Sequence, residues 1–484
     1  MRQSSHADIP SISFRGLCIS HRSVMAAPGR PAFAGRPGGV PAIHALAGSL
    51  SPVSVDARNK SGHDRRKTYT RRYAGNFGSA LVAAVVAFGA SSVGSVVTAQ
   101  SVSSSTEDSS PSNDHLGPVL PEDIKVPPNA LTDWLASENI RLFGWAQGGY
   151  TASSTGAGLL EIEPLMNRFG NSWLFNQGAL VLERTLTPDW SWGFRSEFYM
   201  GSDAAFLHPV NGFGPEGEKF STDFRQAYVS VHAPVVTEDG VDVKLGRQYV
   251  PIGYETTMAP YRVQYSLSYV WKYAQNGATT GAITTAHVDT SLDVIGGVTL
   301  GANSLFELRG RAPDYIARGL YWVDADHQTQ LVGTLYTGPL PMVPAKGRGG
   351  NWQTLLEFHV THNVNPRLAL EFETNLGWET QDPGNNGNTS QWHGTLARAI
   401  VHVNPLLDVN FRAEWFDDVN GSRTGIPADY FEVTPGLNIM PTPWLNFLPE
   451  VRWDHATRPA FGPQAETARH NNQWTFAIAA LLKF

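Results

Sequence analysis

The 484-residue chain has little cysteine and little charge. Its one cysteine, Cys18, excludes an intramolecular disulfide and a zinc site built on several thiolates. Charged residues make up 16% of the chain, whereas a soluble domain usually has about a quarter. The mean hydropathy of −0.22 nevertheless argues against a bundle of apolar membrane helices. With 11% aromatic residues and 47 glycines, the composition favours a β-barrel that faces lipid.

The first hundred residues differ from the rest of the chain. Residues 1–72 form a basic, low-complexity extension with 12 Lys and Arg side chains against three acidic ones. Residues 73–99 hold the longest uncharged apolar stretch and end in Val97-Thr98-Ala99, which is typical of a signal peptide cleaved after Ala99. A membrane anchor is the alternative interpretation of this stretch. Because residues 1–60 precede an otherwise complete signal, we expect the natural start codon to lie further downstream.

Removal of residues 1–99 changes the charge balance. The mature chain keeps 24 basic and 40 acidic side chains, so its formal charge is −16. Nucleic-acid binding requires a cationic surface and is therefore not expected. The mature chain also has no cysteine, which suits an oxidising compartment. Residues 100–139 have the composition of a disordered linker, within which residues 129–139 could form one short helix.

From residue 140 to residue 484 apolar residues recur at every second position, which is the period of a β-strand. The C-terminal segment is the clearest case, with apolar Trp474, Phe476, Ile478, Ala480, Leu482 and Phe484. The alternating segments run to ten or more residues, whereas strands of soluble proteins average about five or six. A tilted strand that crosses a bilayer needs about 9–11 residues.

The connections alternate between short turns and long polar loops. The long loops are 151–171, 201–222, 250–276, 301–316, 338–350, 380–389, 417–427 and 455–470. Eight long loops on one side give about 16 strands, within a range of 14–18. Because every backbone amide in hydrocarbon must be paired, the sheet must close on itself. We therefore predict an all-β fold: a transmembrane, antiparallel, up-and-down β-barrel over residues 140–484, whose inward side chains are polar around a water-filled lumen.

The C-terminal strand carries a second signal. A terminal Phe484, with Trp474 and Phe476 at alternate positions before it, resembles the strand that the barrel-assembly machinery recognises. We therefore expect this machinery and the lipid of the outer membrane to be partners of the chain.

Short motifs along the barrel region resemble a known family, the OmpL-like β-barrel porins of bacterial outer membranes. The resemblance covers roughly residues 140–484, and the order of the motifs carries it more than any one motif. The motifs are Asn167-Arg168-Phe169, Trp192-Gly193-Phe194-Arg195, Gly201-Ser202-Asp203, Gly246 with Ile252-Gly253-Tyr254-Glu255, Ala259-Pro260, Glu414-Trp415-Phe416, Leu448-Pro449-Glu450 with Arg452 and Asp454, and Asn471-Asn472-Gln473. The resemblance implies an outer-membrane channel without a defined solute.

Charged side chains at inward positions are the candidates to line a pore. They are Arg195, Glu197, Arg225, Lys244, Glu371, Glu373, Arg398, Arg412, Glu414, Glu450 and Arg452. Three opposite-charge pairs lie two residues apart on one face, at 195/197, 412/414 and 450/452. Such charges either set up a field that selects ions or pair across strands and stiffen the wall. The acidic excess of the mature chain predicts a mild preference for cations.

The longest loop, Tyr249–Gly277, contains seven aromatic residues. Its candidate residues for a constriction are Tyr254, Glu255, Tyr261, Arg262, Tyr265, Trp271 and Lys272. One interpretation is that the loop folds inward, narrows the barrel and contacts polar solutes such as sugars. The other is an outer aromatic girdle with a loop that packs on its neighbours.

Signals for catalysis, metals and cofactors are poor. The glycine-rich segment 211–217 fits GxGxxG but contains Pro215 and lacks a strand–turn–helix context. His359 and His362 lie three apart in a strand and face opposite sides, and the turn 324–327 is better read as a solvated turn than as a metal site. We therefore predict a porin for passive diffusion of small hydrophilic solutes. The alternative is a substrate-selective channel, for example for sugars. A less favoured alternative is an outer-membrane enzyme or a structural barrel. The sequence is also compatible with a homo-oligomer.

Overall fold

In the computed structural model, residues 130–484 are described except for 161, 163–165, 210–211, 213–217, 276, 309, 341–350, 465 and 468. The predicted extension, the signal peptide and the linker up to residue 129 lie outside the described residues. So does most of the glycine-rich segment 211–217.

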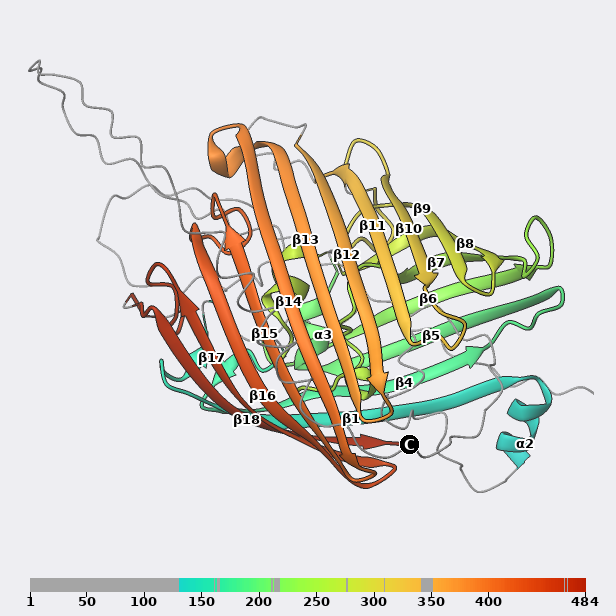
Figure 1. Cartoon of the computed structure of the whole chain (residues 1–484), viewed down its shortest axis with the longest axis horizontal. Helices are drawn as coiled ribbons and strands as arrows, with labels where there is room; N and C mark the ends of the chain where they lie inside the picture. Colours follow the sequence, from blue (N-terminus) through green and yellow to red (C-terminus); the bar gives the residue numbers. More distant parts are fainter. Residues whose placement is uncertain are drawn as a thin grey trace, which may run out of the picture. The chain divides into compact units, whose positions relative to one another are not determined.

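Sixteen long strands close into one antiparallel barrel, as Figure 1 shows. Their bounds are β1 Ile140–Ser153, β4 Ser172–Arg184, β5 Ser191–Gly201, β6 Ser221–Ala233, β7 Val241–Tyr249, β8 Ala278–Asp289, β9 Leu292–Thr299, β10 Asp314–Trp322, β11 Thr329–Pro339, β12 Trp352–Asn365, β13 Leu368–Asp382, β14 Asn388–Asn404, β15 Leu407–Asp418, β16 Ala428–Thr442, β17 Leu445–Ala456 and β18 Asn472–Lys483. The predicted fold class and strand number are confirmed.

Each strand pairs with its neighbours in sequence, and β1 closes the ring by pairing with β18. At this junction Tyr150 lies opposite Ile478, and the amides and carbonyls of Gly144 and Phe484 bond to each other at 2.7 and 2.9 Å. Two short strands, β2 (Gly158–Leu159) and β3 (Phe169–Gly170), form a separate small sheet in the loop after β1. Closure leaves the barrel without an unpaired edge, as a sheet in hydrocarbon requires.

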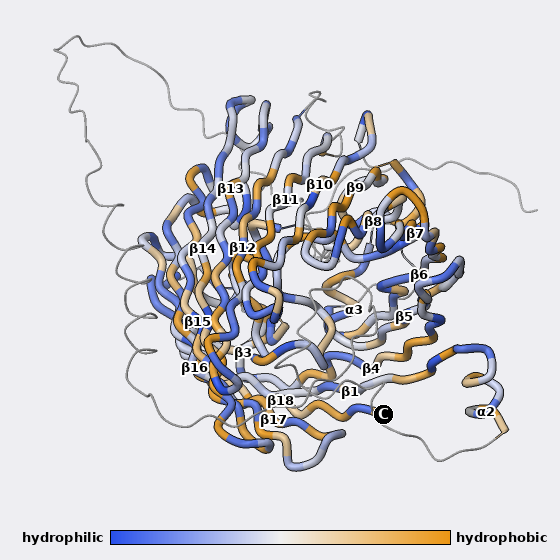
Figure 2. The backbone as a smooth tube through the Cα atoms, turned by 45° about the vertical axis from the view of Figure 1, so that its right-hand side comes forward, coloured by the Kyte–Doolittle hydropathy of each residue, from blue (hydrophilic) through white to orange (hydrophobic). Residues whose placement is uncertain are grey.

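The two faces of the strands differ as the alternation predicts. In β18, Trp474 and Phe476 are 46% and 54% exposed on the outer face, while Gln473 and Thr475 are buried on the inner face. Hydrophobic and hydrophilic residues alternate along the strands in Figure 2. The inside and outside of the barrel are therefore those assigned from the sequence.

Short turns join the strands at one end of the barrel and longer loops join them at the other. The helix α2 (Ala130–Ser137) precedes β1, and α3 (Ser202–Leu207) begins the loop after β5. Strand β10 begins at Asp314, slightly earlier than the loop 301–316 predicted. No helix in the described part of the chain is long and apolar enough to cross a membrane.

The inner face is not polar throughout, which corrects the expectation from the sequence. Strands β8–β12 present an apolar cluster to the interior, together with residues from the loop after β7. Its members are Val250, Ile252, Ile283, Ile295, Ile316, Leu320, Val332, Tyr336 and Leu355. The physical reason is that Val250 and Ile252 of this loop belong to the same cluster, so part of the wall packs against protein.

Candidate functional site

The described residues of the segment between β7 and β8, 250–275 and 277, lie inside the barrel, and we call this segment the inserted loop. It contains a 3₁₀ turn, η2 (Ala259–Tyr261), and a short π-helical turn, η3 (Val270–Ala274). Its entry favours Gly253, which has a φ of +76° that other residues rarely adopt. The Gly253 amide donates a 2.9 Å hydrogen bond to Glu357 on β12. The loop therefore reaches the far wall of the barrel soon after it leaves β7.

Wall carboxylates accept hydrogen bonds from the loop backbone. The Glu450 carboxylate accepts from the amides of Tyr265, at 2.9 Å, and Ser266, at 3.1 Å. The Glu414 carboxylate accepts from the amides of Tyr269, at 2.7 Å, and Val270, at 3.0 Å. A third wall carboxylate, on β13 at residue 373, accepts from the loop amide of residue 254 at 3.2 Å. These bonds provide acceptors for amides that are buried inside the barrel.

Wall guanidiniums bind the carbonyls of the same stretch. Arg412 donates from Nη1 to the Ser266 carbonyl at 2.7 Å, and Arg452 donates to the Leu267 carbonyl at 2.8 Å. Carboxylates and guanidiniums of β15 and β17 thus bind successive groups along one stretch of loop. Charged side chains predicted to line the pore instead hold the inserted loop on this wall.

Glu255 ties the loop to two further strands. Its carboxylate accepts hydrogen bonds from Arg398 on β14, from Arg412 on β15 at 2.9 Å, and from the Ser268 amide at 2.8 Å. Burial alone would raise the pKa of Glu255, but the guanidiniums of Arg398 and Arg412 hold that pKa below its ordinary value. The carboxylate is therefore ionised and neutralised by its partners at neutral pH.

The loop also binds the wall formed by β1 and β4. Arg262 donates to Gln147 at 2.6 Å, and its guanidinium lies 3.7 Å from Asp203 of α3. Burial raises the pKa of Asp203, and Arg262 opposes this rise. The Tyr265 hydroxyl donates to Asn176 at 2.7 Å. Arg262 and Tyr265 of the loop are thus hydrogen-bonded to side chains of this wall.

The other predicted loop residues pack against protein. Tyr254 lies edge-on to His359, with ring centroids 6.2 Å apart. Lys272 lies 4.6 Å from the centre of the Tyr273 ring, and Tyr261 packs beside a cluster on β1 and β4. Trp271 lines the pocket described below. The loop thus bonds to the inner wall of the barrel, and most of its aromatic side chains are part of the packing.

Several predicted wall charges form ion pairs along β4–β6. Arg195 lies 2.9 Å from Glu197 and 3.1 Å from Glu183 of the adjacent strand. Arg225 pairs with Asp223 at 3.0 Å. These groups stiffen the wall, and Arg225 also lines the pocket described below.

On β13–β17 the closest ion pairs differ from the predicted pairs 412/414 and 450/452. Arg412 bonds to Glu432 of β16 at 3.0 Å rather than to Glu414. Arg452 bonds to Asp454 at 2.8 Å. On β13 and β14, the predicted residues 371 and 398 pair with each other at 2.6 Å. Arg412 and Arg398 thus pair with carboxylates of adjacent strands, whereas Arg452 pairs within its own strand.

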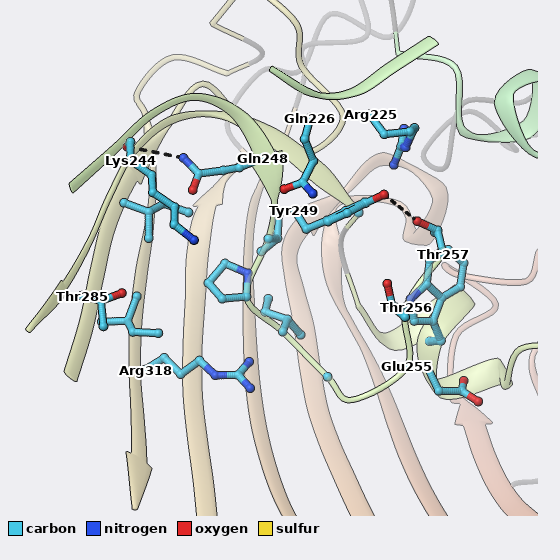
Figure 3. A pocket seen from close by; sticks show the side chains of 18 residues that line it. Arg225, Gln226, Lys244, Gln248, Tyr249, Glu255, Thr256, Thr257, Thr285 and Arg318 are labelled. Atoms are coloured by element: carbon cyan, nitrogen blue, oxygen red, sulfur yellow. Dashed lines mark hydrogen bonds between the residues drawn. The ribbon is translucent and has the colours of Figure 1, made fainter. Parts of the chain in front are cut away.

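A pocket of about 90 Å³ lies between the inserted loop and the wall formed by β6–β10 (Figure 3). Its charged lining comprises three cations, Arg225, Lys244 and Arg318, and one carboxylate, Glu255. The apolar lining includes Ile295 of the wall. The pocket therefore combines a cationic rim with an apolar surface.

Sequence reasoning missed Arg318, Glu357 and Gln177. Gln177 of β4 donates to the Thr257 carbonyl at 2.6 Å and accepts from the Ala259 amide at 3.2 Å. Each of the three lies at an inward position of its strand, which is the signal that could have identified them. Their loop partners could not be read from the period, because they lie far away in sequence.

Local hydrogen bonds stabilise the turn 324–327. Asp324 accepts hydrogen bonds from the amides of Gln328 at 2.7 Å and Thr329 at 2.9 Å, and His327 stacks on Trp322. Within the residues that the structure describes, no group of three or more His, Cys, Asp or Glu side chains could hold a metal ion.

Removal of the Glu450 carboxylate should loosen the loop. In Glu450→Ala the amides of Tyr265 and Ser266 lose their acceptor, at a cost of about 1–3 kcal/mol for an unsatisfied buried group. We expect faster amide hydrogen exchange over residues 262–268 in detergent-solubilised protein. Glu238→Ala, at an exposed turn, is the control and should change nothing. Unchanged exchange in Glu450→Ala would contradict this role for Glu450.

A family model and solved structures are similar to this chain. The family model described as "Putative beta-barrel porin-2, OmpL-like" matches residues 139–484. Among solved structures, an anion-selective porin from Comamonas acidovorans has 12% identity and a TM-score of 0.51, over 71% of this chain and 99% of that one. The channel DcaP of Acinetobacter baumannii has 11% identity and a TM-score of 0.47, over 71% and 97%. OmpF of Salmonella typhi has 14% identity and a TM-score of 0.48, over 71% and 97%. No curated protein matches the sequence.

Proposed function

Because this chain belongs to the OmpL-like family of β-barrel porins, it is a porin of the bacterial outer membrane, and we propose that its solutes pass between the inserted loop and the wall of β6–β10. Passage is passive diffusion of small hydrophilic solutes, and we propose that no covalent step accompanies it. The family match covers the whole barrel, from residue 139 to residue 484.

The proposed path rests on an asymmetry in the contacts of the inserted loop. The inserted loop bonds to β1, β4 and β12–β17, through side chains such as Gln147, Glu357 and Glu450. The pocket lies on the other side of the loop, against β6–β10. A solute that follows this side meets side chains of the rim and passes one bond that holds the loop, from the Thr257 hydroxyl to the Tyr249 hydroxyl of β7 at 3.1 Å.

The sugar-selective alternative receives less support. It requires aromatic rings of the loop that are accessible to the solute. Tyr265 and Tyr269 are fully buried, and their hydroxyls donate to Asn176 at 2.7 Å and to Asp454 at 2.5 Å. These two rings hold the loop and have no free face for a sugar.

Reconstitution tests the proposed function directly. Purified protein in planar bilayers should give stepwise, ohmic conductance, and proteoliposomes should swell with small sugars and resist larger ones. Absence of both activities in correctly folded protein would contradict a porin function for this barrel.

The pocket lining predicts a preference for anions, although the mature chain is acidic overall. Lys244 and Arg318 face the solute path, with the Glu357 carboxylate 3.7 Å from Arg318, and the Glu255 carboxylate is neutralised by two guanidiniums. Charges at the path act over short distances, while surface charges are screened within about 10 Å at 0.1 M salt. We expect Lys244→Glu to shift the zero-current potential in a KCl gradient toward cation preference.

The control for this measurement is Arg367→Glu, because Arg367 is exposed in the turn between β12 and β13. It changes the net charge by the same amount as Lys244→Glu but should leave the zero-current potential unchanged. Equal shifts in the two variants would show that net charge, rather than the pocket, sets ion preference.

A further inference from the structure

The pocket beside the inserted loop has an apolar side. Ile283 of β8 and Ile295 of β9 line it from the wall, and Val250 and Ile252 line it from the loop. All four belong to the apolar cluster inside β8–β12. A path for water and inorganic ions alone gains nothing from such a surface, whereas a hydrocarbon group gains about 0.8 kcal/mol for each buried CH₂.

The cationic side of the pocket contains a guanidinium with unused bonding capacity. The Arg318 side chain is 3% exposed, and its Nη1 atom is 3.7 Å from Glu357 but has no hydrogen-bond partner among the described residues. In Figure 3 the Arg318 guanidinium and the Lys244 ammonium both point toward the middle of the pocket. A buried guanidinium with an open donor is suited to a carboxylate.

The carboxylate of the pocket does not compete for these cations. In Figure 3 Glu255 points away from Arg318 and Lys244. It bonds instead to Arg398 and Arg412 on the opposite wall. An incoming anion therefore meets Arg318 and Lys244 without displacing Glu255.

Resting on the proposed path, we propose that this pocket is a binding site for small organic anions that carry an apolar group, such as short-chain carboxylates. The carboxylate binds at Arg318 and Lys244, and the hydrocarbon group packs against Ile283 and Ile295. The volume of about 90 Å³ suits a small ligand. Binding is weak and reversible, because a solute held tightly would not leave the channel.

Three probes of about the same size separate the contributions to binding. Butyrate has the charge and the apolar chain, lactate has the charge with a polar chain, and butyramide has the chain without the charge. Each is added to one side of a planar bilayer in 0.1 M KCl while the current through single channels is recorded. We expect butyrate to lower the open-channel current in a saturable way at millimolar concentration. Lactate and butyramide should have much weaker effects.

Pocket variants test where butyrate binds. Arg318→Gln should raise the half-blocking concentration of butyrate about tenfold, as expected for loss of a charge-assisted hydrogen bond, and Arg318→Lys should restore part of the affinity. Ile295→Thr should weaken block by butyrate roughly fivefold and leave the effect of lactate unchanged. Arg367→Gln, at the exposed turn, is the matched control and should behave like the wild type.

The outcomes distinguish this inference from the porin function. Channels that conduct KCl but respond equally to the three probes, or that keep their butyrate block in Arg318→Gln, would overturn the anion site and leave the porin intact. Absence of conductance in wild-type protein would contradict the porin function itself. Selective block by butyrate that Arg318→Gln and Ile295→Thr both weaken supports the site.

Discussion

Replacing residues 256–270 by a short glycine–serine linker is expected to increase single-channel conductance several-fold. This stretch lies across the barrel and bonds to both walls, for example through Arg262 to Gln147 and through Tyr265 to Glu450. Its removal opens the β12–β17 side to water. The freed charges are then hydrated or pair with each other, as Arg452 and Glu414 already do at 3.9 Å. Conductance steps in planar bilayers measure the change.

The control for loop removal is the same linker inserted at Val236, in the exposed turn between β6 and β7. This insertion should leave the conductance of the wild type. An unchanged conductance after loss of residues 256–270, in protein that still folds, would show that the inserted loop does not narrow the channel.

Phe411→Arg is expected to destabilise the barrel by about 2–4 kcal/mol, the range for an arginine facing lipid at mid-bilayer. Phe411 lies in the middle of β15 on the outer face and is 41% exposed, and Phe476 in β18 is 54% exposed at a similar position. In the folded protein each variant places a guanidinium in hydrocarbon. Denaturant titration in micelles or vesicles, monitored by tryptophan fluorescence, gives the free energy of unfolding.

Val236→Arg provides the comparison for this prediction. Val236 is 90% exposed in a turn, so the same kind of substitution should leave the free energy of unfolding nearly unchanged. If Phe411→Arg and Phe476→Arg were as harmless as Val236→Arg, the outward face of the strands would not contact lipid.

Much of the fold could be predicted from the sequence, because lipid and water impose a strict alternation on each strand. The period of two places Phe476 outward and Gln473 inward, and both are found there. The alternation of short and long connections gives the number of strands. Closure then follows from the need to pair every amide.

The arrangement inside the barrel could not be predicted in the same way. The sequence places Glu450 and Arg452 on one face, two residues apart, and so suggests a pair. In the structure the Glu450 carboxylate instead accepts hydrogen bonds from the loop amides of residues 265 and 266, which are 185 and 184 positions away. Periodicity decides which face a side chain occupies, but it carries no information on a loop that enters the lumen.

The apolar inner wall escaped prediction for a related reason. Strands β8–β12 carry apolar residues on both faces, such as Ile295 inside and Val294 outside. An apolar inward residue is unfavourable against water and favourable against another apolar side chain. Only the position of Val250 and Ile252 in the loop shows which of the two applies.

The contacts of the inserted loop have a consequence for the order of folding. Its hydrogen bonds to β12–β17 join residues 98 to 185 positions apart. The partners of the loop therefore lie on strands that come much later in the sequence. The loop can bond to its partners on β12–β17 only after these strands lie side by side in the wall. The barrel is therefore expected to assemble first as a wide intermediate, and the loop to settle in a later kinetic phase that conductance recordings during refolding would detect as a decline from large to small steps.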